Sequence, residues 1–431
     1  MQKPARTREV WYKLDNAAII FPAVSGDRNT NVFRLCCELR ENVDPEILQQ
    51  ALDIAMRSFP YFRVVMRRGL FWFYLERSEL LPKVELENER PCNRIFYKNV
   101  KELLLRVSYY NRRVNLEVFH SVADGAGAIQ LLHTMIHQYI LLRYAQELPE
   151  NLPAPHNEAP PSHMEEDSFR RYYKPGDKKS PFKRKAFTIA GTLLPSGTIS
   201  VIEATVPTGQ MLALAKSKGA TITAYLAALL IFSIYRELMP RRAVLHNIGL
   251  TIPVDLRGHF VSESSRNFFS VVEVNYNFSQ EPDDFDSVLR SVAEQLSKKV
   301  DKGALSARLS YTMAVQKNIL TRFTPLFLKN LILRIAYHKA ETCTTSALSN
   351  MGRITVPEPF NGYISRFVCL LNPTALHRVK ACVCSFEDQL VIAFSSCIAE
   401  TQAQKFFVRH LTQNGVEVCL RCNGVNNDEI L

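Results

Sequence analysis

The stretch Glu117–Met135, EVFHSVADGAGAIQLLHTM, changes its hydrophobic periodicity at its centre. The residues up to His120, NLEVFH, alternate between apolar and polar as in a half-buried strand, whereas IQLLHTMIHQYILL has helical spacing. His120 and Asp124 are therefore predicted to flank a strand-to-helix turn, where Gly125 and Gly127 permit a tight backbone. The end of a strand presents a side chain rigidly. By spacing alone, however, HxxxDG fits a structural histidine at a turn as well as a catalytic base.

The composition is that of a folded, soluble protein. The 431 residues are 47% hydrophobic and 22% charged, and this length suggests two or three domains, of which we expect two. The ten cysteines have no regular spacing, which argues against a disulfide framework and for the cytoplasm. No export signal is apparent, and the longest apolar run, 222–235, is shorter than the ~20 residues that a transmembrane helix needs.

A proline-rich segment divides the chain. LPENLPAPHNEAPPSH, residues 148–163, has five prolines and cannot hold regular structure. We therefore expect an N-terminal part at 1–150, a Pro-rich and basic crossover linker at 151–190 and a C-terminal part at 191–431. Strand and helix patterns alternate irregularly on both sides, which favours two α/β layers of mixed sheet over a doubly wound parallel fold.

Positive charge is concentrated in this linker. Residues 170–185, RRYYKPGDKKSPFKRK, carry eight Lys or Arg and one Asp, whereas the whole chain has a net charge of +11. The stretch is either a solvated connector or a site for an anionic ligand, with Lys178, Lys179, Lys183 and Arg184 as possible donor phosphate contacts. No nucleic-acid reading element accompanies it, so we expect no nucleic-acid partner. A nucleic-acid or membrane-surface binder would lose affinity steeply with salt.

Several motifs together resemble the chloramphenicol-acetyltransferase-like superfamily, which includes the condensation domains of peptide synthetases. They are the HxxxDG turn, the Pro-rich break, and IPVDLRGHF (252–260), RNFF (266–269) and SNMGRI (349–354) in the second half. The opening WYKLDNAAIIFP (11–22) is most similar to bacterial alcohol-acetyltransferase-like proteins. The resemblance covers essentially the whole chain. It implies two similar α/β subdomains with a tunnel and active site between them, and no cofactor beyond an acyl thioester co-substrate.

The resemblance also implies residue roles. The shared motif is HxxxD, often HHxxxDG, and its second histidine, here His120, is the catalytic one. Phe119 stands in the place of the first histidine, which makes a peptide-forming condensation domain less expected. Asp124 is implied to turn away from His120 and to pair with an arginine, with Gly125 beside it in the turn. Arg257 is the candidate partner, although a surface arginine at a strand end would fit the same position.

Two further groups of polar residues have competing interpretations. Ser349 and Asn350 could face the tunnel and stabilise an oxyanion, or they could be simple turn residues before Gly352. His133 and His137 stand four apart on a predicted helix, like a zinc pair, but Thr134 replaces the expected glutamate and no third ligand is evident. We therefore expect no metal site.

We interpret the sequence as an O- or N-acyltransferase. A thioester is already activated, so the enzyme must chiefly deprotonate an alcohol or amine acceptor as it attacks. A neutral imidazole, with an ordinary pKa of ~6.5, suits that task near pH 7. Acyl-CoA is the favoured donor. The alternatives are condensation-type transfer from the phosphopantetheine arm of an acyl carrier protein, and a catalytically silent binding module of the same fold.

Overall fold

Strands and helices alternate throughout a computed structural model that describes residues 10–149, 152, 161–175, 185–239, 246–318 and 323–425. The first half contains β1 (Trp11–Lys13), α1 (Phe21–Val24), β2 (Val32–Leu39), α2 (Pro45–Ser58), η1 (Pro60–Phe62), β3 (Val64–Arg68), β4 (Phe73–Arg77), β5 (Val84–Leu86), β6 (Leu105–Tyr110), β7 (Arg113–Phe119) and α3 (Gly125–Arg143). The second half contains α4 (Pro161–Met164), α5 (Ser168–Tyr172), β8 (Ser200–Pro207), α6 (Thr208–Ser217), α7 (Ile222–Leu238), β9 (Ile248–Asp255), β10 (Phe269–Tyr276), α8 (Phe285–Lys299), α9 (Lys302–Lys317), α11 (Leu326–Glu341), β11 (Ser346–Arg353), η3 (Phe360–Tyr363), β12 (Ile364–Leu371), β13 (Val379–Phe386), β14 (Gln389–Ser396), α12 (Gln402–Gln413) and β15 (Cys419–Cys422).

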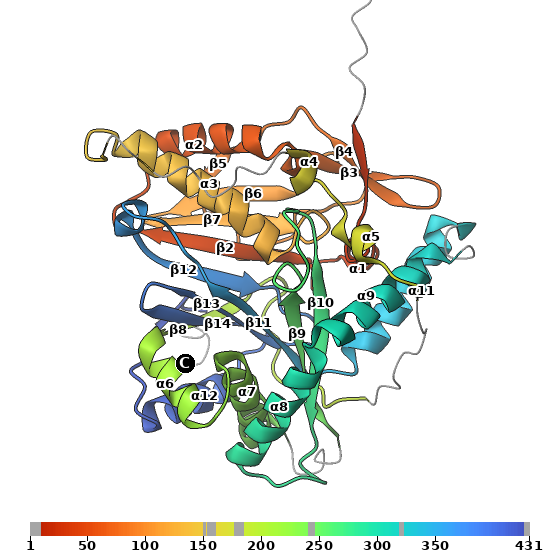
Figure 1. Ribbon diagram of the computed structural model, residues 1–431, viewed down its shortest axis with the longest axis vertical. Coiled ribbons are helices and arrows are strands. Elements are labelled where there is room, and N and C mark those ends of the chain that lie inside the picture. Colours follow the sequence, from red (N-terminus) through yellow and green to blue (C-terminus); the bar gives the residue numbers. More distant parts are fainter. Residues whose placement is uncertain are drawn as a thin grey trace, which may run out of the picture.

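The strands form two main sheets and one small one. The five-stranded sheet has the order β12-β2-β7-β6-β5, and the seven-stranded sheet has the order β10-β9-β11-β13-β14-β8-β15. A three-stranded sheet, β1-β4-β3, lies near the first of these. Both main sheets mix parallel and antiparallel pairs (Figure 1). The prediction of two α/β subdomains with mixed sheets is confirmed.

Local capping rules explain where the principal helices begin. Asp44 caps α2 by accepting hydrogen bonds from the backbone amides of Glu46 (3.0 Å) and Ile47 (3.1 Å), and Pro45 occupies the first turn. Thr221 caps α7 in the same way through the amide of Ala224. Both helices thus begin at a residue whose side chain accepts hydrogen bonds from the first turn.

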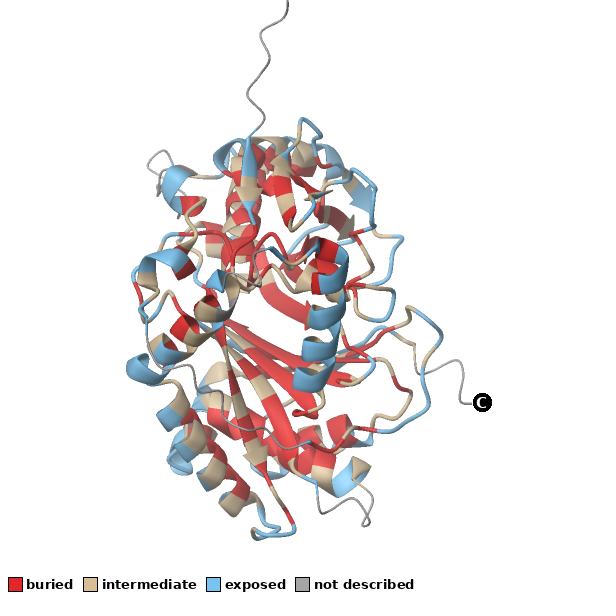
Figure 2. Cartoon of the chain, turned by 90° about the vertical axis from the view of Figure 1, so that its right-hand side faces the viewer, coloured by how far each residue is buried: buried red, intermediate tan, exposed pale blue. Residues whose placement is uncertain are grey.

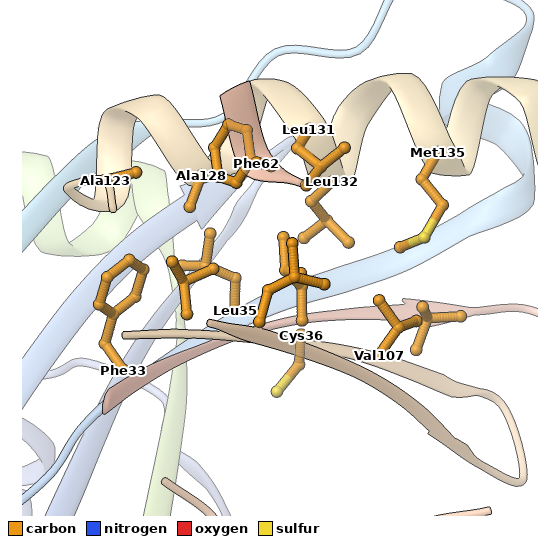
Figure 3. Packing of buried hydrophobic residues seen from close by; sticks show 14 of the residues in the cluster. Phe33, Leu35, Cys36, Phe62, Val107, Ala123, Ala128, Leu131, Leu132 and Met135 are labelled. Atoms are coloured by element: carbon orange, nitrogen blue, oxygen red, sulfur yellow. The ribbon is translucent and has the colours of Figure 1, made fainter. Parts of the chain in front are cut away.

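Each subdomain has its own hydrophobic core. In the first, α3 lies across the five-stranded sheet, and Leu131, Leu132 and Met135 point from the helix toward Leu35 and Val107 on the strands (Figure 3). In the second, α7 is buried along most of its length against the seven-stranded sheet. Buried residues follow the strands through the middle of the molecule, and exposed residues lie mainly on the outer helices and loops (Figure 2).

The second half of the sequence contributes one strand, β12, to the sheet of the first subdomain. β12 comes from the second half but pairs antiparallel with β2 at the edge of the five-stranded sheet. It also packs against β13 and β14, and in Figure 1 it lies between β2 and β13. Cys382 and Cys384, which face this strand from β13, belong to the core of the first subdomain. The subdomains are therefore joined by a shared core as well as by the chain.

Among the described residues no single helix has the length and apolar character to cross a membrane. The pair α6 and α7 reaches that length and composition only together, with a bend of 79° between the two helices.

A buried ion-pair network fixes β12 between the sheets. Arg366 on β12 donates to Glu38 of the first sheet (2.9 Å) and to Glu203 of the second (2.6 Å). Arg113 reaches Glu203 from the first sheet (3.1 Å), and Arg421 bonds to Glu38 (3.0 Å). Except for Arg113 and Arg421, which are partly exposed, these side chains are almost fully buried. Removal of Arg366 would therefore leave two carboxylates without their shared partner.

We predict that Arg366→Ala lowers the free energy of unfolding by ~3–5 kcal/mol, because Glu38 and Glu203 would lose the fully buried cation that they share. Urea denaturation of the purified variant measures this loss. The matched control is Arg421→Ala, because Arg421 bonds to the same Glu38 but its side chain is 51% exposed. That variant should lose no more than ~1 kcal/mol. Equal losses in the two variants would contradict the assigned importance of burial.

Candidate functional site

The predicted strand-to-helix turn lies at the junction of the subdomains. His120 directly follows β7, and its backbone amide bonds to the carbonyl of Asn31 (2.8 Å). A Cβ atom added to Gly127 would lie 1.9 Å from the carbonyl oxygen of Ser265, so only glycine allows this approach of the second subdomain. At Gly125 the contact would be the flexible side chain of Met351 (2.7 Å). Gly127 is therefore the more constrained of the two glycines.

Asp124 and Arg257 form the ion pair that the resemblance implies. The guanidinium of Arg257 binds both carboxylate oxygens of Asp124, at 3.0 and 3.1 Å. Asp124 also accepts from the backbone amide of Gly127 (2.8 Å), which caps α3, and from that of Phe268 (2.7 Å). Its side chain is 7% exposed, and no hydrogen bond joins it to His120. The carboxylate is thus occupied with holding the turn against the second subdomain.

Asn267 fixes the protonation pattern of His120. Its amide nitrogen faces two acceptors, the carboxylate of Asp15 (3.2 Å) and the backbone carbonyl of His120 (3.0 Å). Its amide oxygen must therefore face Nδ1 of His120, which lies 3.0 Å away. An oxygen acceptor requires a proton on Nδ1, so the network assigns the tautomer with an unprotonated Nε2. Nε2 has no hydrogen-bond partner among the described residues.

The Asp15 carboxyl group is fully buried behind this arrangement. It accepts from the backbone amide of Ala18 (2.8 Å) and from Asn267, and Arg266 lies 3.8 Å away. Burial raises the pKa of Asp15 to about 7, although Arg266 and the two hydrogen bonds act in the opposite direction. A carboxyl oxygen accepts a hydrogen bond in either protonation state, so Asn267 keeps its orientation through this range.

Aromatic rings surround the imidazole. Phe21 stacks on it with a centroid distance of 4.6 Å, Phe33 meets it edge-on at 5.1 Å, and Phe269 lies at 5.4 Å. Burial lowers the pKa of His120 below its usual value, because a low-dielectric environment disfavours the imidazolium ion. Asp124 and the hydrogen bond with Asn267 oppose this effect but do not reverse it. The lowered pKa favours the neutral imidazole, which can accept a proton at Nε2.

The two residues predicted to stabilise an oxyanion, Ser349 and Asn350, lie on opposite sides of strand β11. Asn350 donates to the hydroxyl of Thr223 (2.9 Å) and accepts from the amide of Gly352 (2.8 Å), on the side of β11 that faces α7. Ser349 lies on the opposite side of the same strand, as Met351 does, and is nearly buried.

The possible donor phosphate contacts in the linker lie outside the described residues; they are Lys178, Lys179, Lys183 and Arg184.

The histidine pair on α3 packs against aromatic rings. His133 contacts Phe367 and His137 contacts Phe360. Within the described ranges, no group of three or more His, Cys, Asp or Glu side chains is arranged to hold a metal ion.

A large cavity is lined in part by residues that neighbour the site in the sequence. Its volume is about 930 Å³, and its lining includes Leu14 and Ile19 together with Trp11, Trp72 and Met313. His120 does not line it. However, its lining residues Leu14 and Ile19 are sequence neighbours of Asp15, which bonds to Asn267, and of Phe21, which stacks on His120. The lining also includes Lys13, Glu76, Arg170 and Lys317, so this cavity combines apolar walls with charged groups.

Sequence reasoning missed Asn267, Asp15 and Phe21. All three lie in stretches that carry the family resemblance, RNFF and WYKLDNAAIIFP, but no periodicity or spacing relates them to His120. Asn267 is a polar residue that lies in the sequence between Arg266 and two phenylalanines. This pattern is the sequence feature that could have marked it as a candidate site residue. Its bond to a residue 147 positions away appears only in the folded chain.

Comparison with known proteins identifies the fold. No family model matches the sequence, and no curated protein resembles it at the sequence level. Solved structures do match along nearly the whole chain. The complex of F. graminearum TRI101 with coenzyme A and deoxynivalenol superposes with a TM-score of 0.64 at 11% identity, covering 95% of this chain and 99% of that one. Polyketide synthase associated protein 5 from Mycobacterium tuberculosis gives 0.58 at 14% identity, covering 94% and 98%.

A third match extends the comparison to peptide synthetases. The first condensation domain of the calcium-dependent antibiotic synthetase, in complex with a substrate analogue, gives a TM-score of 0.58 at 13% identity and covers 95% of this chain and 99% of its own. The chain therefore shares the two-subdomain fold of these acetyltransferase and condensation-domain structures, as the sequence motifs predict.

We predict that Asp124→Ala lowers the free energy of unfolding by ~3–5 kcal/mol, because Arg257 would remain buried without its main partner. Urea denaturation measures the change. Asp255 offers a matched control: it also bonds to Arg257 (2.7 Å), but its side chain is 47% exposed. Asp255→Ala should lose at most ~1 kcal/mol. A loss from Asp124→Ala as small as that of the control would show that the pair does not hold the turn.

We predict that long-range proton–nitrogen NMR of the imidazole finds the proton of His120 on Nδ1 and a pKa below 6.5. In Asn267→Ala the oxygen acceptor for Nδ1 is lost, so the Nε2-protonated tautomer should become populated. Asn275, in the neighbouring strand β10, supplies the control substitution Asn275→Ala, which leaves His120 unchanged. Predominant Nε2 protonation in the wild-type protein would overturn the assignment.

Proposed function

We propose that the protein transfers an acyl group from a thioester donor to the hydroxyl or amino group of an acceptor, with His120 as general base. The observation that carries this proposal is the contact of Nδ1 of His120 with the amide oxygen of Asn267 (3.0 Å), which leaves Nε2 available to accept a proton at the junction of the subdomains. The fold supports it, because solved structures of this fold include TRI101 bound to coenzyme A and a trichothecene 15-O-acetyltransferase.

The reaction follows from this arrangement. Nε2 of His120 removes the proton from the acceptor O–H or N–H as that atom forms a bond with the thioester carbonyl carbon. The tetrahedral intermediate then collapses, the carbon–sulfur bond breaks, and the imidazolium returns the proton to the departing thiolate. Asn267 holds the ring during both steps, since its amide oxygen accepts from Nδ1–H in the neutral and the protonated state. Both substrates meet at one imidazole, so no acyl-enzyme is required.

Four residues position this base without reacting themselves: Asp124, Gly125, Gly127 and Arg257. They hold the turn in which His120 is presented and do not contact the imidazole nitrogens. Ser349 lies on the side of β11 that faces the first subdomain, and its hydroxyl is our candidate for an oxyanion donor. The amide nitrogen and oxygen of Asn350 are already engaged with Thr223 and Gly352, which makes Asn350 a poorer candidate.

Acyl-CoA is the donor that we favour, and it acts as a co-substrate. TRI101, which shares the fold, is solved with coenzyme A. Phe119 also replaces the first histidine of the HHxxxDG motif, which argues against peptide-forming condensation. The alternative donor is an acyl group on the phosphopantetheine arm of a carrier protein. It is supported by the condensation-domain match and by the polyketide synthase associated protein.

We predict that His120→Ala lowers kcat/KM for acyl transfer at least ~100-fold, because a positioned general base typically contributes that much. The assay supplies a panel of acyl-CoAs with mixed alcohols and amines, follows thiol release, and identifies the acylated product by mass spectrometry. His246→Ala is the control, since His246 is exposed and lies outside the site. A His120→Ala enzyme that keeps more than a tenth of the wild-type rate would refute the role.

The pH profile of the same reaction gives an independent check. The neutral form of His120 accepts the proton, so kcat/KM should fall as the pH drops through the pKa of this residue. Because burial lowers that pKa, the midpoint of the acidic limb should lie below 6.5. A midpoint above 6.5 would mean that another group controls the rate.

A further inference from the structure

Helix α11 carries an exposed apolar face that no described part of the chain covers. Its side chains point outward from one side of the helix, because residues four apart in a helix lie above one another. They are between 42% and 70% exposed, and they are Phe327, Leu328, Leu331, Ile332 and Ile335. Surface helices of soluble proteins normally place charged or polar residues there. A contiguous apolar patch of this kind marks an interaction site.

The apolar face of α11 continues onto the β3–β4 turn. The amide of Leu326 bonds to the carbonyl of Leu70 (3.0 Å), and Leu70 is 74% exposed. Phe323, 66% exposed, meets the ring of Phe71 at 6.2 Å. The patch thus unites segments that are more than 250 residues apart in the sequence. We call α11 together with residues 69–72 and Phe323 the α11 face; it lies on the right of Figure 1, the side turned to the viewer in Figure 2.

A basic groove of about 620 Å³ runs along the α11 face. Phe327 and Leu331 form one wall, and the cationic side chains that line the groove are Arg67, Arg68, Lys98, Lys101 and Arg334. Its lining contains no Asp or Glu. Arg67 is paired with Glu76, and Arg334 donates to the carbonyl of Ala23. Burial and the nearby Arg334, Arg94 and Arg68 lower the pKa of Lys98, so this ammonium group lies close to three guanidinium groups.

Both tryptophans of the chain lie beside this face. Trp11 is 57% exposed and packs edge-on against Tyr74, and Trp72 lies under the ammonium group of Lys329 (3.1 Å from the ring centroid). Trp and Tyr favour the boundary between lipid headgroups and acyl chains, because their rings are apolar and carry one polar group. Apolar side chains, a cationic border and interfacial aromatic rings therefore occur together at a single place on the surface.

We propose that the α11 face docks the protein onto an anionic phospholipid bilayer. Phe327, Leu331 and Ile335 would enter the region below the headgroups, and α11 would lie parallel to the membrane plane. Lys98 and Lys101 would contact lipid phosphates, which would bring negative charge into a groove whose lining contains no carboxylate. The net charge of +11 adds a long-range attraction to such a surface.

A bilayer fits this face better than a protein partner does. The exposed side chains form a continuous apolar stripe without a hydrogen-bonding group among them, whereas protein interfaces intersperse polar contacts about every 100–200 Å². A second copy of the chain would bring another basic groove toward this one. The large cavity lined by Trp11, Leu70 and Trp72 also adjoins this face, so a lipid bound there would lie next to the cavity.

The test uses the full chain and vesicles of phosphatidylcholine with or without phosphatidylglycerol. We expect the protein to co-sediment with the anionic vesicles and to bind the neutral ones much more weakly. Tryptophan emission should shift to shorter wavelength on binding, because Trp11 and Trp72 are the only tryptophans and both line the cavity at this face. The double variant Leu331→Asp/Ile335→Asp should weaken vesicle binding at least ~10-fold and abolish the shift.

Charge reversal separates the electrostatic contribution. Lys98→Glu/Lys101→Glu should weaken binding to anionic vesicles by at least ~10-fold, since each lysine near the surface contributes a few-fold. Helix α6 provides matched controls: Leu212→Asp and Lys216→Glu change an exposed apolar and an exposed cationic residue far from the α11 face in sequence, and both should bind as the wild type does. Unchanged melting temperatures establish that the variants are folded.

The proposal is overturned if the wild-type protein does not bind anionic vesicles, or if the α11 variants bind as tightly as the α6 controls. It is also overturned if the α11 variants instead lose binding to an acidic carrier protein, or lose self-association, while the wild-type protein ignores vesicles. His120→Ala should bind vesicles like the wild-type protein. Membrane docking and acyl transfer can therefore fail separately.

Discussion

The bidentate pair between Asp124 and Arg257 is the interaction on which the site depends. Asp124 belongs to the turn after β7, and Arg257 belongs to the connection between β9 and β10 in the other subdomain. The same connection carries Asn267, which holds the imidazole of His120. One ion pair therefore sets the position of the histidine relative to the residue that orients it. Replacing Arg257 with lysine would keep the charge but lose the fork geometry that matches two carboxylate oxygens.

Asp124 and Asn267 have different roles around His120, and this difference affects the pKa of the imidazole. A carboxylate hydrogen-bonded to Nδ1 would stabilise the imidazolium and raise its pKa. Here a neutral amide occupies that place, and the carboxylate is neutralised by Arg257. Burial among Phe21, Phe33 and Phe269 can then dominate and keep the imidazole neutral. The site is suited to a base that starts each cycle without a proton.

Sequence patterns predict those features that depend on neighbouring residues, and they fail for the rest. The strand-to-helix turn and the mixed α/β class both follow from local periodicity. Strand alternation could also have shown that Ser349 and Asn350 face opposite sides of β11, so that only one of them can face the first subdomain. The orientation of Asn267 could not have been predicted, because it requires Asp15, 252 residues away. Helix α11 gives no amphipathic signal, since its apolar residues continue around the exposed side.

The α11 face and the imidazole are joined by a short chain of contacts. Arg334 of α11 donates to the carbonyl of Ala23 in α1 (2.7 Å), and α1 packs against α11. The first residue of α1 is Phe21, whose ring stacks on His120. A ligand that displaces α11 must therefore either break the bond to Ala23 or move α1 with it. In the second case the ring that shields His120 moves too, and the polarity around the base changes with the occupancy of the surface.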